Sequence, residues 1–108
     1  MKKITHRADF DAELKAGDRL ALFYSAYCPF CQAFLPTFEK LAKSARGGCV
    51  EICTDGLSEL EDLFSVDVVP TVLYFTGGRL SARLDGVLGR GLTEAGLREF
   101  MKECGFSK

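Results

Sequence analysis

The sequence predicts an α/β fold built on a mixed β-sheet, and two observations carry that prediction. The first is an apolar strand at residues 20–24, followed by a long helical pattern and a second apolar strand at 49–53. Strand, helix and strand in this order form a parallel βαβ unit. The second observation is the pair Gly77-Gly78 between two strand-like runs, which is typical of a hairpin turn and predicts antiparallel pairing of the last two strands.

The elements before the first cysteine are short. Residues 2–7 favour a strand, and residues 9–17 favour a helix with Asp9 as its N-cap and Gly17 as the residue that ends it. The run at 20–24 is apolar throughout, as expected of a strand that is buried on both faces.

The longest element is a helix predicted from residue 28 to about residue 46. Its apolar side chains recur at helical spacing and form one stripe: Cys31, Phe34, Leu35, Phe38, Leu41, Ala42 and Ala45. Pro36 lies inside this pattern and cannot donate to the preceding turn, so we expect a kink there. The pair Gly47-Gly48 is expected to end the helix.

The second half of the chain begins with a predicted short helix at residues 58–64. Ser58 and Glu61 have the spacing of a capping box at its start. Pro70 stands directly before a strand at 71–75, where a backbone donor is not yet needed.

The C-terminal elements complete the pattern. Residues 80–84 alternate between apolar and polar side chains, as a half-exposed strand does. Residues 86–92 contain three glycines and predict a loop. Thr93 is a candidate N-cap for a final helix that ends near Cys104.

Length and composition narrow the class of protein. The 108 residues predict one domain over 1–108, and 47% apolar residues suffice for a core. The 14 basic residues nearly balance the 15 acidic ones, so there is no basic patch for nucleic acid. No window approaches 18 apolar residues, and the N-terminus has no apolar signal region. We therefore expect no membrane span, a cytoplasmic location and a monomer.

The candidate reactive groups of the chain are two cysteines, Cys28 and Cys31. They lie where the strand at 20–24 ends and the long helix begins. Helical residues three apart have Cβ atoms about 5–6 Å from each other, so the pair can close a disulfide and open it again. Unpaired N–H groups at a helix N-terminus stabilise a thiolate at Cys28. Pro29 fits the first helical position, where its missing N–H costs nothing. The arrangement favours thiol–disulfide exchange.

Four local signatures make the chain resemble the thioredoxin family over nearly its whole length. They are the segment Phe23-Tyr24-Ser25-Ala26-Tyr27-Cys28-Pro29-Phe30-Cys31, Pro36, the segment Val69-Pro70-Thr71, and Gly86. The resemblance implies the thioredoxin fold, a mixed central β-sheet of four to five strands flanked by about four helices. It also implies that the Val69–Pro70 peptide bond is cis and packs beside the cysteines.

The resemblance further implies a mechanism. The Cys28 thiolate attacks a substrate disulfide, and Cys31 then resolves the mixed disulfide. The substrate-binding residues implied by the family are Tyr27, Pro29, Phe30, Val69 and Pro70. The expected partners are disulfide-containing protein substrates and a thioredoxin reductase or a similar electron donor. The redox-active Cys28–Cys31 disulfide serves without a further cofactor, in electron transport and cell redox homeostasis.

The dipeptide between the cysteines departs from the usual thioredoxin pattern. Pro29-Phe30 is similar to the dipeptide of glutaredoxins, whose cysteines lie close to the N-terminus. Here about 20 residues and a strand–helix unit come first, as in thioredoxins. A glutathione-linked, glutaredoxin-like disulfide reductase is therefore the alternative function.

A second departure concerns the proton that the resolving cysteine must lose. Thioredoxins usually carry a buried Asp six residues before the first cysteine, with a Lys facing it from the next strand. Leu22 and Glu51 occupy these positions. Either Glu51 or a water could replace the missing acid, and the other interpretation of Glu51 is an exposed or salt-bridged strand residue. Tyr24 and Tyr27 replace the usual tryptophan pair; they can line a substrate surface, although core packing explains Tyr24 equally well.

The remaining cysteines favour packing roles. Five cysteines is an odd number, which argues against a framework of structural disulfides. Cys49 and Cys53 are four apart on one strand, roughly 13 Å from each other, and cannot pair. We expect Cys104 to pack in the core. A metal- or cluster-binding module using the Cys28 and Cys31 thiolates is the alternative of another class, although a four-ligand zinc site needs two more ligands, so we expect no metal.

Two further alternatives are weaker. A non-catalytic adaptor with this fold is disfavoured because both cysteines are present. Arg79, Arg83 and Arg90 are expected to be solvated, with glutathione binding by one of them as the other possibility.

Overall fold

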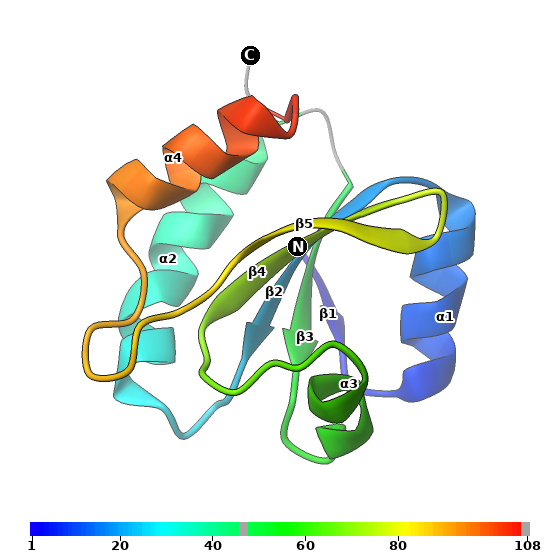
Figure 1. Ribbon diagram of the computed structural model, residues 1–108, viewed down its shortest axis with the longest axis horizontal. Coiled ribbons are helices and arrows are strands. Elements are labelled where there is room, and N and C mark those ends of the chain that lie inside the picture. The colour runs from blue at the N-terminus through cyan, green and yellow to red at the C-terminus, as the bar shows by residue number, and fades with distance from the viewer. Residues whose placement is uncertain (46–47, 107–108) are drawn as a thin grey trace.

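The computed structural model describes residues 1–45 and 48–106 as a five-stranded mixed sheet with four helices (Figure 1). The elements follow in the order β1 (Lys2–Ile4), α1 (Arg7–Ala16), β2 (Arg19–Tyr24), α2 (Pro29–Ser44), β3 (Cys49–Cys53), α3 (Ser58–Leu63), β4 (Thr71–Thr76), β5 (Arg79–Leu84) and α4 (Glu94–Glu103). The α/β class, the order of the elements and the mixed sheet are confirmed.

The strand order is β1-β3-β2-β4-β5, so β2 lies at the centre of the sheet. It pairs in parallel with β3 and antiparallel with β4. The hairpin between β4 and β5 turns at Gly77 and Gly78, whose φ angles of 58° and 80° are those a tight hairpin turn requires. The C-terminal end of β2, where the cysteine motif begins, therefore lies near the middle of one end of the sheet.

Each face of the sheet has its own core, because successive side chains of a strand point to opposite faces. The face covered by α1 and α3 buries Ile4, Phe10, Ala21, Phe23, Val50, Ile52, Leu57, Leu60, Val66, Leu73 and Phe75. The face covered by α2 and α4 buries Leu20, Leu22, Tyr24, Cys31, Phe34, Phe38, Leu41, Val72, Leu97, Phe100 and Met101. Figure 1 shows the two helix pairs on the two sides of the sheet.

Helix α2 carries the motif into the core. Pro29 occupies its first turn. Four of the seven residues of the predicted stripe are buried, namely Cys31, Phe34, Phe38 and Leu41, and the other three are half-buried. The helix continues through Pro36 and ends at Ser44, with Ala45 as its C-cap. The end predicted near residue 46 and the Gly47 stop lie outside the described residues. The kink at Pro36 stays a prediction.

Outside α2, two of the three predicted N-cap residues are wrong and one is confirmed. Helix α1 begins at Arg7, with His6 as its N-cap residue, so Asp9 lies in its first turn. A carboxylate in that turn still stabilises the helix, because the N-terminal end of the helix dipole is positive. Helix α3 has Leu57 as its N-cap residue, so Ser58 is already helical and cannot form the capping box. Thr93 caps α4, because its Oγ1 accepts a hydrogen bond from the Gly96 N–H at 3.0 Å.

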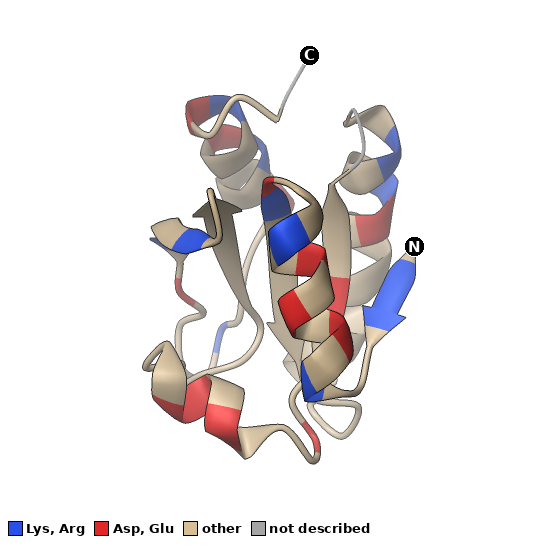
Figure 2. Cartoon of the chain, turned by 90° about the vertical axis from the view of Figure 1, so that its right-hand side faces the viewer, with Lys and Arg blue, Asp and Glu red and all other residues tan. Residues whose placement is uncertain are grey.

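Charge is unevenly distributed over the described elements (Figure 2). Helix α3 carries Glu59, Glu61 and Asp62 and no basic residue, whereas the edge strand β1 carries Lys2 and Lys3. Within residues 1–45 and 48–106, no helix is long and apolar enough to span a bilayer.

Candidate active site

The chain leaves β2 at Tyr24, turns through three residues and enters α2. Cys28 is the N-cap residue, with an extended backbone at φ −94° and ψ 120°. The Gln32 N–H donates to the Cys28 carbonyl at 3.0 Å and closes the first turn of the helix. No acidic side chain stands in that turn to compete for the unpaired N–H groups. The first cysteine therefore lies where a helix favours an anion.

The two thiols differ in their access to solvent. Cys28 is half-buried, and its Sγ donates to the Val69 carbonyl at 3.7 Å. Cys31 is fully buried, and that burial raises the pKa of its thiol to about 12. The neighbouring Cys28 and the Asp55 carboxylate raise the same pKa further, while the backbone at Ser25 lowers it. A substrate disulfide can reach Cys28 but not Cys31.

The loop before β4 forms a wall beside Cys28. The Val69–Pro70 bond is cis, which confirms the expectation from the family resemblance. The Thr71 hydroxyl donates to the Val68 carbonyl at 2.6 Å and accepts from the Gly86 N–H at 3.0 Å. A Cβ added at Gly86 would lie 2.2 Å from the Pro70 carbonyl oxygen, so a side chain cannot fit there.

Asp55 holds the loop that leads into the motif, and it was not among the residues predicted from the sequence. Its carboxylate accepts from the Ser25 hydroxyl at 2.8 Å and from the Ala26 N–H at 2.9 Å, and the Cys53 thiol donates to it at 3.5 Å. The Ala26 and Ser25 bonds hold the pKa of Asp55 below its usual value. From the other side, the Gln32 amide donates to the Ala26 carbonyl at 2.7 Å. The position of Asp55, just past the carboxyl end of the strand next to β2, is the signal that could have found it.

An apolar surface surrounds Cys28. Among the predicted substrate-binding residues, Tyr27 is 88% and Phe30 42% exposed, and Pro29 is exposed between them. Of the other two, Val69 is half-buried and Pro70 is buried.

The loop after β5 extends this apolar surface with two residues that the sequence analysis did not single out. Val87 is 44% and Leu88 85% exposed. The loop folds back through a bridge between Val87 and Gly91, and a Cβ added at Gly91 would lie 3.1 Å from the Phe30 Cβ. The loop therefore packs directly against the motif.

Glu51 lies in the middle of β3 and is fully buried. Both of its carboxyl oxygens lack a hydrogen-bond partner within the described part of the chain. Burial raises its pKa to about 7, and the nearby Glu39 adds to the rise, while Lys3 opposes it. The interpretation of Glu51 as an exposed or salt-bridged residue is wrong. Leu22, its neighbour on β2, is also fully buried.

Comparisons with known proteins agree with this geometry. The family model described as thioredoxin matches residues 1–103. The chain belongs to the thioredoxin family. It is accordingly a thioredoxin-type oxidoreductase.

Relatives and solved structures support the assignment. The chain is 27% identical over 90 residues to a thioredoxin of Mycoplasmoides gallisepticum, covering 82% of this chain and 90% of that protein. It is 29% identical over 105 residues to protein disulfide-isomerase A5 of Bos taurus, covering 92% of this chain and 20% of that protein. A Plasmodium falciparum thioredoxin structure superposes with a TM-score of 0.84 at 19% identity, covering 95% of this chain and 98% of that one. A mutant thioredoxin from Halobacterium salinarum gives a TM-score of 0.81 at 22% identity, covering 99% of this chain and 90% of that one.

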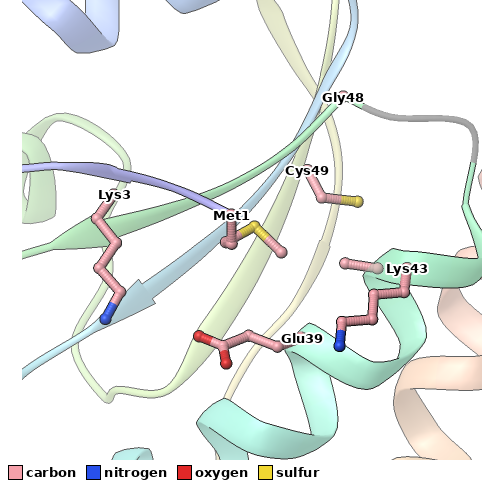
Figure 3. A pocket seen from close by; sticks show the side chains of 7 residues that line it. Met1, Lys3, Glu39, Lys43, Gly48 and Cys49 are labelled. Carbon is pink, nitrogen blue, oxygen red and sulfur yellow. The ribbon is translucent and has the colours of Figure 1, made fainter.

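The other three cysteines of this thioredoxin-family chain lie half-buried against the core beneath α2 and α4. Burial raises the pKa of Cys49 to about 11 and also raises that of Cys104. Cys49 lines a cavity of about 550 Å³ between the β1–β3 edge and α2, together with Met1, Lys3, Glu39, Ala42, Lys43 and Gly48 (Figure 3). No residue of the Cys28–Cys31 motif lines this cavity. Across residues 1–45 and 48–106, no three His, Cys, Asp or Glu side chains gather as metal ligands would.

The three arginines are not alike. Arg79 and Arg90 are exposed, as predicted. Arg83 is not free in solvent, because it pairs with Asp85 at 2.8 Å and donates to the Phe64 carbonyl at 2.8 Å. Its guanidinium links β5 to the end of α3, because its five N–H groups can donate to several acceptors at once.

Proposed function

We propose that the chain reduces protein disulfides through the Cys28–Cys31 dithiol. The observation that carries this proposal is the arrangement of the two thiols. A half-buried thiol belongs to the N-cap residue of a 16-residue helix, and a second, fully buried thiol lies one turn further along. Because Cys31 is buried and burial raises its pKa to about 12, Cys28 is the nucleophile and Cys31 the resolving residue.

The reaction proceeds in two exchanges. The Cys28 thiolate attacks one sulfur of a substrate disulfide, a Cys28–substrate bond forms, and the other substrate sulfur leaves as a thiolate. Cys31 then loses its proton and attacks Cys28. The Cys28–Cys31 bond forms and the second substrate sulfur leaves. The substrate gains two electrons, and the dithiol becomes a disulfide.

The substrate chain is expected to lie over the apolar surface around Cys28. Tyr27, Pro29 and Phe30 would contact it from α2 and the preceding loop, and Val69 and Pro70 from the opposite wall. Apolar contacts suit varied protein substrates, because they need no fixed pattern of hydrogen bonds. A thioredoxin reductase or a similar donor in the cytoplasm would return the oxidised dithiol to its reduced form, and no cofactor beyond the dithiol is required.

Reduction of insulin tests the proposal. The chain is supplied with electrons by dithiothreitol or by thioredoxin reductase, and precipitation of the freed insulin chain is followed. We expect turnover well above the dithiothreitol background and its loss in Cys28→Ser. Activity equal to the dithiothreitol background, or full activity in Cys28→Ser, would contradict the proposal.

A glutathione-linked reductase is the second candidate, and the Pro29-Phe30 dipeptide is what favours it. Turnover of a small glutathione mixed disulfide with glutathione and glutathione reductase would support this candidate. Complete dependence on thioredoxin reductase would exclude it. The reduction potential also separates the two, because the family values are about −270 mV for thioredoxin and about −200 to −230 mV for glutaredoxins.

A further inference from the structure

The segment that joins α3 to β4 carries the wall beside Cys28 (Figure 1). It begins at Phe64, the residue that ends α3, and runs to the cis bond between Val69 and Pro70. The segment lies between a helix and a strand and belongs to neither, so no continuous ladder of backbone hydrogen bonds fixes it. The contacts that hold this segment therefore decide where the wall lies.

Arg83 of β5 holds the start of the segment. Its Nη1 donates to the Phe64 carbonyl at 2.8 Å, and its Nη2 donates to the Ser65 carbonyl at 3.1 Å. Carbonyl groups at a helix C-terminus have no partner within the helix, so a side chain can satisfy them. Ser65 has a φ angle of 53°, which residues with a side chain rarely adopt and which persists only where surrounding contacts hold it. Arg83 supplies such a contact.

Asp85 holds the guanidinium of Arg83 from the other side. The Arg83 Nε donates to both carboxylate oxygens of Asp85 at 3.0 Å, and Nη2 donates to Oδ1 at 2.8 Å. All three nitrogens of Arg83 thus donate to groups of this chain. A planar guanidinium reaches acceptors on two sides in a fixed geometry, which the single ammonium group of a lysine does not. Arg83 and Asp85 therefore act as one pair.

The same pair is joined to the end of the segment. Asp85 directly precedes Gly86, whose backbone is so close to Pro70 that a Cβ would lie 2.2 Å from the Pro70 carbonyl oxygen. The Gly86 N–H donates to the Thr71 hydroxyl at 3.0 Å, and that hydroxyl donates to the Val68 carbonyl at 2.6 Å. The arginine–aspartate pair therefore connects both ends of the segment.

Space beside the segment makes this support necessary. A cavity of about 340 Å³ lies against it, and Asp67, Val68 and Arg83 are among the residues that line the cavity. Residues beside such a space can shift without displacing core side chains, because a void offers them few opposing contacts. Val69, which accepts the hydrogen bond from the Cys28 thiol, follows directly. A shift of the segment would therefore move the wall relative to Cys28.

We propose that Arg83, held by Asp85, positions the Val69–Pro70 wall and thereby determines how well a protein substrate binds across Cys28. This inference rests on the proposed function. Arg83 acts through backbone carbonyls and Asp85, so it is a positioning residue and not a catalytic one. A protein chain must fit between α2 and the wall, whereas a small disulfide needs only access to the half-buried Cys28 thiol. Loss of Arg83 should therefore slow the reduction of protein disulfides and spare small ones.

Two disulfides of different size test the proposal. The reduced chain is mixed with excess oxidised insulin or with 5,5′-dithiobis(2-nitrobenzoate), and loss of the Cys28 thiol is followed by acid quenching, alkylation and mass mapping. The second-order rate constants are expressed per folded molecule. We expect Arg83→Met to lower the insulin rate constant about tenfold, because a displaced wall misplaces the substrate. The rate constant for the small reagent should stay within about twofold of the wild-type value.

Further variants separate the pair from its surroundings. Arg83→Lys keeps the charge but loses the planar group, so it should show an intermediate loss. Asp85→Asn should slow the insulin reaction less than Arg83→Met, and the double variant should be no slower than Arg83→Met alone, because the two residues act together. The matched control is Arg79→Met, which replaces an exposed arginine of the same strand and should leave both rate constants unchanged.

Amide hydrogen exchange reports the order of the segment without any substrate. In Arg83→Met we expect faster exchange at Val66 and Gly86, whose N–H groups donate to the Glu61 carbonyl and the Thr71 hydroxyl. Exchange in the central strand β2 should not change. The same measurements on Arg83→Lys and Asp85→Asn decide the matter if Arg83→Met does not fold.

Two results would overturn the inference. One is unchanged exchange at Gly86 in folded Arg83→Met. The other is a pair of rate constants, for insulin and for the small reagent, that fall together or do not fall at all. A wild-type chain whose Cys28 reacts with the small reagent but not with insulin would instead overturn the proposed function, and with it the role of the wall in binding protein substrates.

Discussion

The two faces of the sheet bury different kinds of side chain: aromatic rings on one face, and thiols and a carboxyl group on the other. On the face covered by α1 and α3, Phe10 packs edge-on against Phe23 and Phe75, with ring centroids 6.4 and 5.8 Å apart. Phe64 joins this aromatic cluster, 5.1 Å from Phe75. On the face covered by α2 and α4 lie all five cysteines and Glu51, whose carboxyl oxygens have no hydrogen-bond partner within residues 1–45 and 48–106.

The difference shows how a chain of 108 residues holds reactive groups in its core. Aromatic rings bury large apolar areas and leave no polar group to satisfy, so the α1 and α3 face stabilises the fold. Burial raises the pKa of both Cys31 and Glu51. The buried Glu51 carboxyl group costs stability as the pH rises through 7, whereas Cys31 is a thiol at neutral pH and holds the second sulfur of the dithiol inside the core. A single sheet thus divides a stabilising core from a reactive one.

Breaking the aromatic cluster should have the largest effect on stability. Phe10 is 2% exposed, and we expect Phe10→Ala to lower the free energy of unfolding by about 3–5 kcal/mol. The activity of the molecules that remain folded should not change, because Phe10 faces away from the thiols. Urea unfolding and insulin reduction measure the two quantities. Leu63→Ala, at a 57% exposed site on α3, is the control and should change stability by less than about 0.5 kcal/mol. A large loss of activity per folded molecule in Phe10→Ala would contradict the division between the faces.

On the reactive face, removing the buried acid should stabilise the fold. The pKa of Glu51 is raised from 4.5 to about 7 in the folded chain. The folded state therefore binds the proton more tightly, and this contribution to stability is complete below pH 4.5 and is lost as the pH rises through 7. At about 1.4 kcal/mol per pKa unit, the loss amounts to at most about 3.5 kcal/mol.

Glu51→Met replaces the carboxyl group with an apolar side chain of similar length. We expect it to be more stable than the wild type at pH 8, with the advantage shrinking at pH 5, as urea unfolding at both pH values would measure. Glu99→Met on α4 is the control for loss of an exposed acid. A pH-independent difference between Glu51→Met and the wild type would show that Glu51 does not titrate in this range.

Substitution at Gly86 should affect stability less and activity more. A Cβ there would lie 2.2 Å from the Pro70 carbonyl oxygen, so the backbone must move. Overpacking of this kind costs about 1–3 kcal/mol. Because Val69 accepts a hydrogen bond from Cys28, a shift of this loop should lower insulin reduction by about tenfold in Gly86→Ala. Wild-type turnover in a folded Gly86→Ala variant would show that the loop does not position the substrate.

The smallest effect is expected at Asp55, which lies outside both cores. Asp55→Ala removes the acceptor for Ser25 and Ala26 and should lower insulin reduction a fewfold, because the loop before Cys28 loosens. It should also lower the pKa of Cys31, since the Asp55 charge raises it. Thiol titration of Cys31 checks the second effect, with Asp62→Ala on α3 as the control. An unchanged Cys31 titration would remove Asp55 from the electrostatics of the site.

Most of the fold could be predicted from the sequence because local patterns carry it. The apolar run at residues 20–24, the helical stripe after Cys28 and the Gly77-Gly78 turn each determine one element and its neighbours. Helix starts were harder to predict, since Asp9 and Ser58 are good caps whose positions are overridden by where the chain leaves the sheet.

The site was predictable only in part. The Cys28–Cys31 pair follows from spacing, and the cis bond before Pro70 from the family resemblance. The role of Asp55 depends on contacts with residues about 30 positions away, which no local pattern reveals. The burial of Glu51 depends on α2 covering the middle of β3, and an acidic residue in a strand ordinarily predicts exposure.

The central claim, that Cys28 attacks and Cys31 resolves, is tested most directly by trapping the intermediate. Cys31→Ser is incubated with oxidised insulin, and the adduct is located by non-reducing electrophoresis and peptide mass mapping. We expect a stable mixed disulfide through Cys28, which is absent when Cys28 is also replaced by serine. An adduct through Cys49, Cys53 or Cys104 in place of Cys28, or no adduct at all, would contradict it.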